Sequence, residues 1–316
     1  MSDPGPGTRR GIRLAYLLLV VSAFLWACNA VAGRWAPGEV SPQVITTLRW
    51  MFPCLILAVI ARRRIAAERD GIRRSWLRIL LMGTGGFTAF ASLFYAAGAY
   101  TTAVNLALFQ GAIPVFVILL NYAVSREGVS GAQGFGVAIT LLGAGVAATH
   151  GDWSVMRTLD LNRGDVLIVV GCLLYAGYAV ALRTRPKLSA LTFFSAMAAA
   201  AFVSSLPLLA IEWAAGRAVW PTGTGWAIVV FVALGPSLAA QLCFMRGVEL
   251  IGPNRAGLFV NLVPIFGAGL AVLLVGEPFG LNEALALALV LGGIVCAERL
   301  GRRTPSPREA EASKAS

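Results

Sequence analysis

The sequence is dominated by ten stretches of mostly apolar residues, each close to the length of a membrane-spanning helix. A helix needs about 20 mostly apolar residues to cross the hydrocarbon core of a bilayer. The ten stretches are Leu14–Gly33, Val44–Ala61, Ile79–Ala97, Ala103–Val124, Ala132–Ala148, Asp165–Leu182, Leu191–Ala214, Trp226–Met245, Arg255–Val275 and Glu283–Ala297. They predict an all-α polytopic membrane protein with ten transmembrane helices.

The composition excludes a soluble protein. Only 13% of the 316 residues are charged, whereas a soluble domain carries about 25% because its surface faces water. The sequence has no phosphate-binding loop, no metalloprotease motif and a single histidine, so we expect no enzyme activity, no catalytic residues, no cofactor and no metal. The five cysteines lie within apolar stretches and form no CxxC pair, which is typical of buried thiols.

The excess of positive charge indicates an orientation. The chain carries 26 Lys and Arg against 15 Asp and Glu. With a cytoplasmic N-terminus, 21 of the 26 basic residues fall in cytoplasmic segments and 4 in outer loops, and Arg49 lies inside the second stretch. Positive loops remain on the cytoplasmic side. We therefore expect no nucleic-acid partner, and a bacterial inner-membrane protein with both termini in the cytoplasm.

The two halves of the chain repeat each other. A shift of 150 residues aligns Pro114 with Pro264 and Glu127 with Glu277. Each half contains five apolar stretches, and because five is odd the second half enters the membrane upside down. We predict two inverted five-helix repeats around a central cavity, at residues 1–150 and 151–316. Repeats of this kind permit alternating access in secondary transporters.

The motifs of the two halves resemble a known family. The first half carries Pro114, Glu127 and Gly143, and the second carries Pro264 and the run Val-Gly-Glu-Pro at 275–278. Leu48-Arg49-Trp50 stands in the second stretch. The chain resembles the drug/metabolite transporter superfamily, in particular the ten-helix EamA-type exporters, and is most similar to their aromatic amino-acid exporter branch. The resemblance implies export of amino acids and related small metabolites, with aromatic or hydrophobic amino acids favoured.

Polar and aromatic residues within the predicted helices are candidates for the substrate site. Trp26 and Asn29 share one helix face, and the repeat places Tyr175 and Tyr178 on the equivalent face of the other half. The remaining candidates are Tyr95, Gln241, which lies inside its stretch, and Gln110 and Asn261, which lie near the middle of theirs. The alternative interpretation of all eight is packing between helices or a position in the interfacial aromatic belt.

Arg49 and the paired prolines and glutamates have more than one interpretation. Arg49 contacts a substrate carboxylate, or it bonds to carbonyls or extends outward to the interface; we favour the second interpretation. Pro114 and Pro264 break their helices and act as gates or as structural kinks. Glu127 and Glu277 stand at helix ends and are expected to cap or gate. No Asp or Glu lies near the middle of a predicted helix, so we expect uniport or only weak coupling of transport to protons.

Other cargoes and a channel are the alternatives. Nucleotide sugars and sugar phosphates require several interior cations, and Arg49 is the only one. Drug cations require an interior acid. A channel requires polar rings around a pore. Neutral or zwitterionic cargo fits best, so the expected partners are a small-molecule substrate, amino acids above all, and the lipid bilayer, with no obligate protein partner.

Overall fold

The computed structural model describes residues 8–125, 130–149 and 162–299, and these residues contain helices and no strand. The spanning helices are α1 (Arg9–Trp35), α2 (Pro42–Ile60), α5–α6 (Trp76–Gly83 and Phe90–Ala97), α7 (Ala103–Gly111), α8 (Ile113–Ser125), α9 (Gly131–Thr149), α11 (Arg163–Ala181), α12 (Ala190–Ala214), α13 (Gly223–Val232), α14 (Ala240–Ile251), α15 (Pro253–Gly257), α16 (Leu262–Leu270) and α17 (Leu281–Arg299). Two short helices, α3 (Arg62–Ala67) and α4 (Arg69–Arg74), connect α2 to α5.

These helices occupy the ten predicted stretches. In the described part of the chain, eight helices are long and apolar enough to cross a membrane, and α7 with α8 forms a ninth span bent by 40°. The tenth stretch is a shorter apolar helix, Leu281–Ala297. Large apolar side chains such as Leu273 and Leu281 are at least 80% exposed, as expected for a surface that faces lipid. The chain is therefore an all-helical, multi-pass membrane protein.

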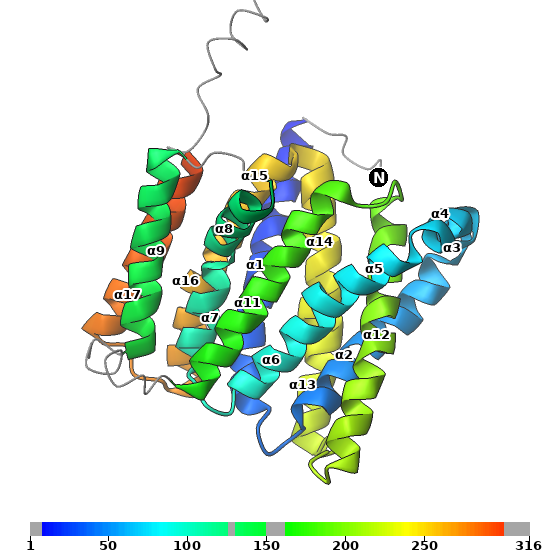
Figure 1. Cartoon of the computed structure of the whole chain (residues 1–316), viewed down its shortest axis with the longest axis horizontal. Coiled ribbons are helices and arrows are strands. Elements are labelled where there is room, and N and C mark those ends of the chain that lie inside the picture. Colours follow the sequence, from blue (N-terminus) through cyan, green and yellow to red (C-terminus); the bar gives the residue numbers. More distant parts are fainter. Residues whose placement is uncertain (1–7, 126–129, 150–161, 300–316) are drawn as a thin grey trace, which may run out of the picture.

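The helices pack side by side in pairs (Figure 1). Helices α9 and α17 pack together at one edge of the molecule, and α2 packs on α12 at the other edge. Between these edges, α1 packs on α14 and α16, while α11 packs on α6 and α8. Segments from the first half of the chain thus pack on segments from the second half throughout the molecule.

Glycines allow the α9–α17 pair to approach closely. A Cβ atom added to Gly136 would lie 2.5 Å from the carbonyl oxygen of Gly293, and one added to Gly293 would lie 2.3 Å from the Thr140 hydroxyl. Both distances are far below van der Waals contact. Small residues at membrane helix interfaces act in this way, because they bring two backbones together.

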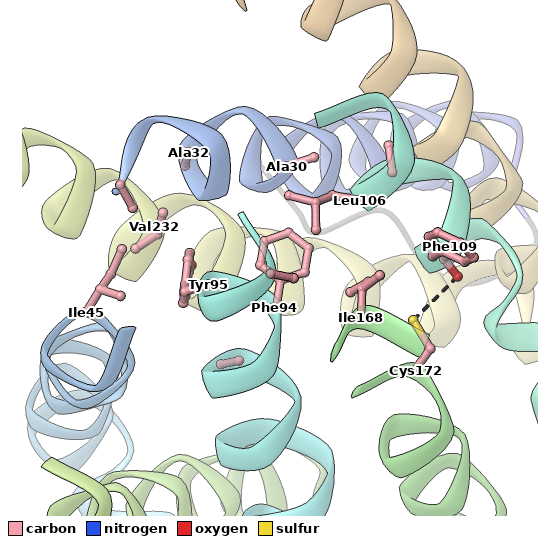
Figure 2. Close-up of a cluster of buried hydrophobic side chains, with 14 of the residues drawn as sticks. Ala30, Ala32, Ile45, Phe94, Tyr95, Leu106, Phe109, Ile168, Cys172 and Val232 are labelled. Carbon is pink, nitrogen blue, oxygen red and sulfur yellow. Dashed lines mark hydrogen bonds between the residues drawn. The ribbon is translucent and has the colours of Figure 1, made fainter. Parts of the chain in front are cut away.

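The largest buried cluster surrounds α6 (Figure 2). Phe94 and Tyr95 of α6 are at most 1% exposed and lie between side chains of α1, α2, α7, α11 and α13. Cys172 of α11 donates its thiol hydrogen to the carbonyl of Phe109, at 3.4 Å. The five cysteines are free thiols. This cluster fixes α6 beside α2, which positions the site described below.

Several spans depart from regular α-helix. The α7–α8 bend falls just before Pro114, and the 3₁₀ turn η4 (Leu258–Asn261) comes just before Pro264. Gly111, at the end of α7, lies against Pro264, since an added Cβ would be 2.8 Å from the proline ring. The π-helical segments η1 (Thr84–Ala89) and η3 (Ala233–Ala239) interrupt two further spans, and η5 (Ala271–Val275) ends the span that contains α16.

Candidate functional site

A buried arginine stands at the centre of the candidate site. Arg49 of α2 is 6% exposed. Its Nε donates to the hydroxyl of Ser237 in η3, at 2.9 Å. Its Nη1 donates to the hydroxyl of Tyr95 at 2.6 Å and to Oδ1 of Asn29 at 3.5 Å. Arg49 therefore bonds to side chains of three other spans, and it does not extend outward to the interface.

The partners of Arg49 also bond to one another. The Tyr95 hydroxyl donates to Oδ1 of Asn29 at 2.7 Å, which closes a three-membered cluster with the guanidinium. Ser237 donates to the carbonyl of Val232, at 2.7 Å. Asn29 and Tyr95 are 4% and 1% exposed. The two predicted substrate residues thus hold Arg49 in this structure.

The positive charge of Arg49 has no negative partner in the described part of the chain. Only two charged side chains are buried there, Arg49 and Asp165, and no carboxylate lies within ion-pair distance of Arg49. A buried charge without a counter-ion is costly unless hydrogen bonds or a ligand compensate it. Nη2 bonds to no described residue and is not fully enclosed. This arrangement suits an anionic group.

An aromatic cluster adjoins the arginine. Trp50, the next residue of α2, stacks on Phe87 of η1 with ring centroids 4.5 Å apart and planes at 6°. Phe87 in turn contacts the ring of Tyr178 on α11, with a centroid distance of 5.4 Å. Tyr175 lies 5.3 Å from Tyr178. The guanidinium carbon of Arg49 is 5.3 Å from the Trp50 ring centre, so the polar and aromatic groups form one continuous cluster.

Trp26 of α1 contacts the segment η3. Its indole N–H donates to the carbonyl of Pro236 in η3 at 3.2 Å, and its ring lies 5.2 Å from Phe244. Pro236 immediately precedes Ser237, so Trp26 and Arg49 reach the same π-helical segment. Trp26, Tyr175 and Tyr178 are each partly exposed. The structure therefore joins five of the eight predicted residues, Asn29 and Tyr95 included, through direct contacts or a shared segment.

The other three predicted residues are not joined to Arg49 by any contact that the structure gives. The Gln110 amide donates to the carbonyl of Leu106 one turn earlier in α7, at 3.4 Å. Gln241 lies in α14 one turn after Ser237, and Asn261 ends η4. All three are partly buried. Their assignment to the substrate site stays a prediction.

Glu277 closes the N-terminus of α7. Its two carboxylate oxygens accept from the backbone N–H groups of Ala103 and Val104, at 2.8 and 3.0 Å. Arg34, at the end of α1, lies 3.8 Å from the same carboxylate. A carboxylate at a helix N-terminus is stabilised by the helix dipole. Its repeat equivalent, Glu127, lies outside the described residues.

Trp50, Phe87 and Ser237 were not among the site residues predicted from the sequence. A signal existed for Ser237, since Gly-Pro-Ser within an apolar span indicates a broken helix. Phe87 carried no comparable signal. The described residues hold no cluster of three or more histidine, cysteine or acidic side chains that could bind a metal ion.

Comparisons with known proteins agree with this architecture. The model of the EamA-like transporter family matches residues 13–149 and again 162–298, one copy in each half. The uncharacterized transporter YyaM of Bacillus subtilis is 24% identical over 290 residues, which cover 90% of this chain and 93% of that protein. The aromatic amino acid exporter YddG of Ancylobacter novellus is 22% identical, over 92% of this chain and 98% of that protein.

A solved crystal structure shows the same fold. It superposes with a TM-score of 0.64 at 21% sequence identity, over 92% of this chain and 99% of that one. The two copies of the family model cover most of the chain, and members of this family are transporters rather than enzymes. The chain belongs to the EamA-like transporter family.

Proposed function

We propose that this protein exports amino acids by alternating access, with aromatic and other hydrophobic amino acids favoured and related small metabolites also accepted. The observation that carries the proposal is the Arg49 cluster: a buried guanidinium held by neutral groups, beside stacked aromatic rings. A zwitterion with an apolar side chain complements both parts. The exporter from Ancylobacter novellus, named for aromatic amino acids, supports the same cargo.

In this proposal the substrate carboxylate bonds to Arg49. The partly exposed residues Trp26, Tyr175 and Tyr178 contact the apolar part of the substrate in a central cavity between the two repeats. The protein resides in the bacterial inner membrane with both termini in the cytoplasm. The strong bias of basic residues toward the proposed cytoplasmic segments supports that orientation.

We also propose uniport or weak coupling to the proton gradient. The buried acid of the described residues, Asp165, lies in the first turn of α11 rather than at the middle of the span. Its Oδ1 accepts from the hydroxyl of Thr101 and the amide of Asn105. A proton relay commonly uses a carboxyl group within the membrane. Uphill amino-acid uptake driven by a pH gradient alone would overturn this part of the proposal.

Counterflow in proteoliposomes tests the function. Liposomes loaded with unlabelled amino acid are supplied with a panel of radiolabelled amino acids, a nucleotide sugar, a sugar phosphate and a lipophilic cation. We expect saturable exchange of aromatic and hydrophobic amino acids, reduced in Trp26→Ala and Tyr178→Ala. Trp213→Ala, at a residue 68% exposed near the end of α12, is the matched control.

Each other outcome contradicts a stated part of the proposal. Exchange of a nucleotide sugar, a sugar phosphate or a cation, with no exchange of amino acids, would show that the substrate is not an amino acid. Flux that does not saturate and shows no counterflow would indicate a channel. Equal exchange by wild type, Trp26→Ala and Tyr178→Ala would remove these two residues from the site.

A further inference from the structure

The two π-helical segments near Arg49 occupy equivalent positions in the two halves. A shift of 150 residues places η1 (Thr84–Ala89) on residues 234–239, which lie within η3 (Ala233–Ala239). One segment falls in each of the two matches to the family model. π-Helical turns are rare and occur frequently at functional sites. Their presence at equivalent places indicates that the fold duplicates this interruption.

The equivalent residues of these two segments support adjacent residues of α2. Phe87 in η1 and Ser237 in η3 are 150 positions apart. Ser237 accepts from Nε of Arg49 at 2.9 Å and donates to the Val232 carbonyl five residues earlier. Phe87 stacks face to face on Trp50. The same position of the repeat therefore contacts the Arg49 guanidinium in one half and the Trp50 ring in the other half.

The chemistry around the two positions has diverged. Near Ser237, the residues that bond to Arg49 of α2 are polar, and they include Asn29 and Tyr95. Around Phe87 they are aromatic, with Tyr178 at 5.4 Å and Phe194 at 6.5 Å between ring centroids. The two equivalent π-helical segments thus contact one cluster centred on α2, η3 at its polar half and η1 at its aromatic half.

A second observation points to a ligand on this face of α2. The indole nitrogen of Trp50 has no hydrogen-bond partner among the described residues, although the residue is only 5% exposed. The hydroxyls of Thr46 and Thr47, one turn away, are also buried and unpartnered. Buried polar groups almost always have a partner, and an amino acid carries both donors and acceptors.

We propose that Ser237 and Phe87 are positioning residues that set substrate specificity. Ser237 fixes the guanidinium of Arg49 through Nε, which leaves Nη2 for the substrate carboxylate. Phe87 supports the Trp50 ring, so that Trp50 and Tyr178 present an aromatic wall to the substrate side chain. This inference rests on the proposed function, because it assigns the two ends of an amino acid to the two halves of the cluster.

The test measures concentration-dependent counterflow of L-phenylalanine and L-leucine in proteoliposomes. In Ser237→Ala we expect the KM for both amino acids to rise about tenfold, since a hydrogen bond to a charged group is lost, with the maximal rate little changed. Ser237→Thr keeps a hydroxyl and is expected to restore the KM. Ser205→Ala is the matched control, because that serine is fully buried and bonds to its own helix backbone.

For Phe87 the expected change is in selectivity. In Phe87→Leu we expect the preference for phenylalanine over leucine, as a ratio of their KM values, to fall about fivefold. Phe193→Leu is the control, since Phe193 is 6% exposed in the same apolar cluster and is not among the stacked rings. Size-exclusion profiles in detergent show whether each variant is folded.

The outcomes separate this inference from the proposed function. Wild-type protein that exchanges no amino acid overturns both. Wild-type exchange with unchanged KM in Ser237→Ala and unchanged selectivity in Phe87→Leu overturns this inference alone. This inference alone is also overturned if the controls Ser205→Ala and Phe193→Leu change KM and selectivity as much as Ser237→Ala and Phe87→Leu do. It is overturned as well if Ser237→Ala lowers only the maximal rate. A variant that does not fold is replaced by Ser237→Cys or Phe87→Met, for which the same changes are expected.

Discussion

At the residue scale, the structure gives two of the predicted substrate residues a partner within the protein. Asn29 and Tyr95 are polar residues within apolar spans, and such residues are expected to face a site or a partner helix. They bond to each other and to Arg49, so in this structure their partner is a charged side chain. Sequence alone identified the three residues but not their mutual contacts, because they come from three different spans.

Tyr95→Phe tests the cluster with minimal change to packing. The ring remains, while the hydroxyl that accepts from Arg49 and donates to Asn29 is removed. A buried donor that loses its acceptor costs about 1–3 kcal/mol, so the melting temperature in detergent is expected to fall. Tyr100→Phe, at a residue 55% exposed, is the control and should leave the melting temperature unchanged. Equal melting temperatures for Tyr95→Phe and wild type would contradict the cluster.

At the element scale, carboxylates from distant elements close the N-termini of several helices. Glu212 near the end of α12 accepts from the Ser41 hydroxyl at 2.6 Å and from the backbone N–H of Gln43, at the start of α2. Glu68, which follows α3, accepts from the backbone N–H of Ser189 at the start of α12. Each carboxylate compensates unpaired N–H groups and the helix dipole. The start of α2 is thus bonded to α12, and the start of α12 is bonded to the residue that follows α3.

The bond at Glu68 makes a pH-dependent prediction. The Ser189 backbone N–H, with the Ser189 hydroxyl, holds the pKa of Glu68 below its usual value. A lowered pKa means that this stabilisation is complete above the unfolded value, about 4.3, and is lost as the pH falls through the folded value. We expect Glu68→Gln to melt at a lower temperature than wild type at pH 7, with the difference vanishing once the pH has fallen below the lowered pKa of Glu68.

Melting curves from about pH 2 to about pH 7, which bracket the titration of a carboxyl group with a lowered pKa, measure this effect. Asp70→Asn is the control, because Asp70 is exposed and its ion pair with the neighbouring Arg69 is long, at 3.9 Å. A difference between Glu68→Gln and wild type that persists at the acid end would show that the carboxylate charge is not the cause.

At the scale of the whole molecule, the sequence predicted the architecture better than the site. Ten apolar stretches, a 150-residue repeat and the prolines at two helix breaks were all visible, because hydropathy and proline act locally. The π-helical segment at Thr84–Ala89 was not predicted, since the Gly85-Gly86 pair indicates a weak point in the helix but not a π-turn. The stacking of Phe87 on Trp50 depends on how α2 packs against its neighbours, and no local pattern reports that.

The inverted repeat gives a prediction about motion. In alternating access by an inverted repeat, the two halves exchange conformations between the inward-open and outward-open states. Each contact made by one half is then replaced by the equivalent contact of the other half. In each half the second helix begins at a serine that bonds to a carboxylate of the other half, Ser41 before α2 to Glu212 and Ser189 before α12 to Glu68, and both bonds are present in this one structure. Exchange therefore preserves both, and α2 with α12 is expected to move as one rigid pair that carries Arg49.

Crosslinking tests this rigid pair. The cysteine pairs Ser41→Cys with Glu212→Cys, and Glu68→Cys with Ser189→Cys, are introduced after the five native cysteines have been replaced. A short, reducible thiol crosslinker then joins each pair in proteoliposomes. We expect counterflow to keep at least about half its rate with either end joined, because neither contact has to open in the exchange of the two halves. Loss of counterflow on crosslinking, restored by reduction, would show that the crosslinked contact opens during transport.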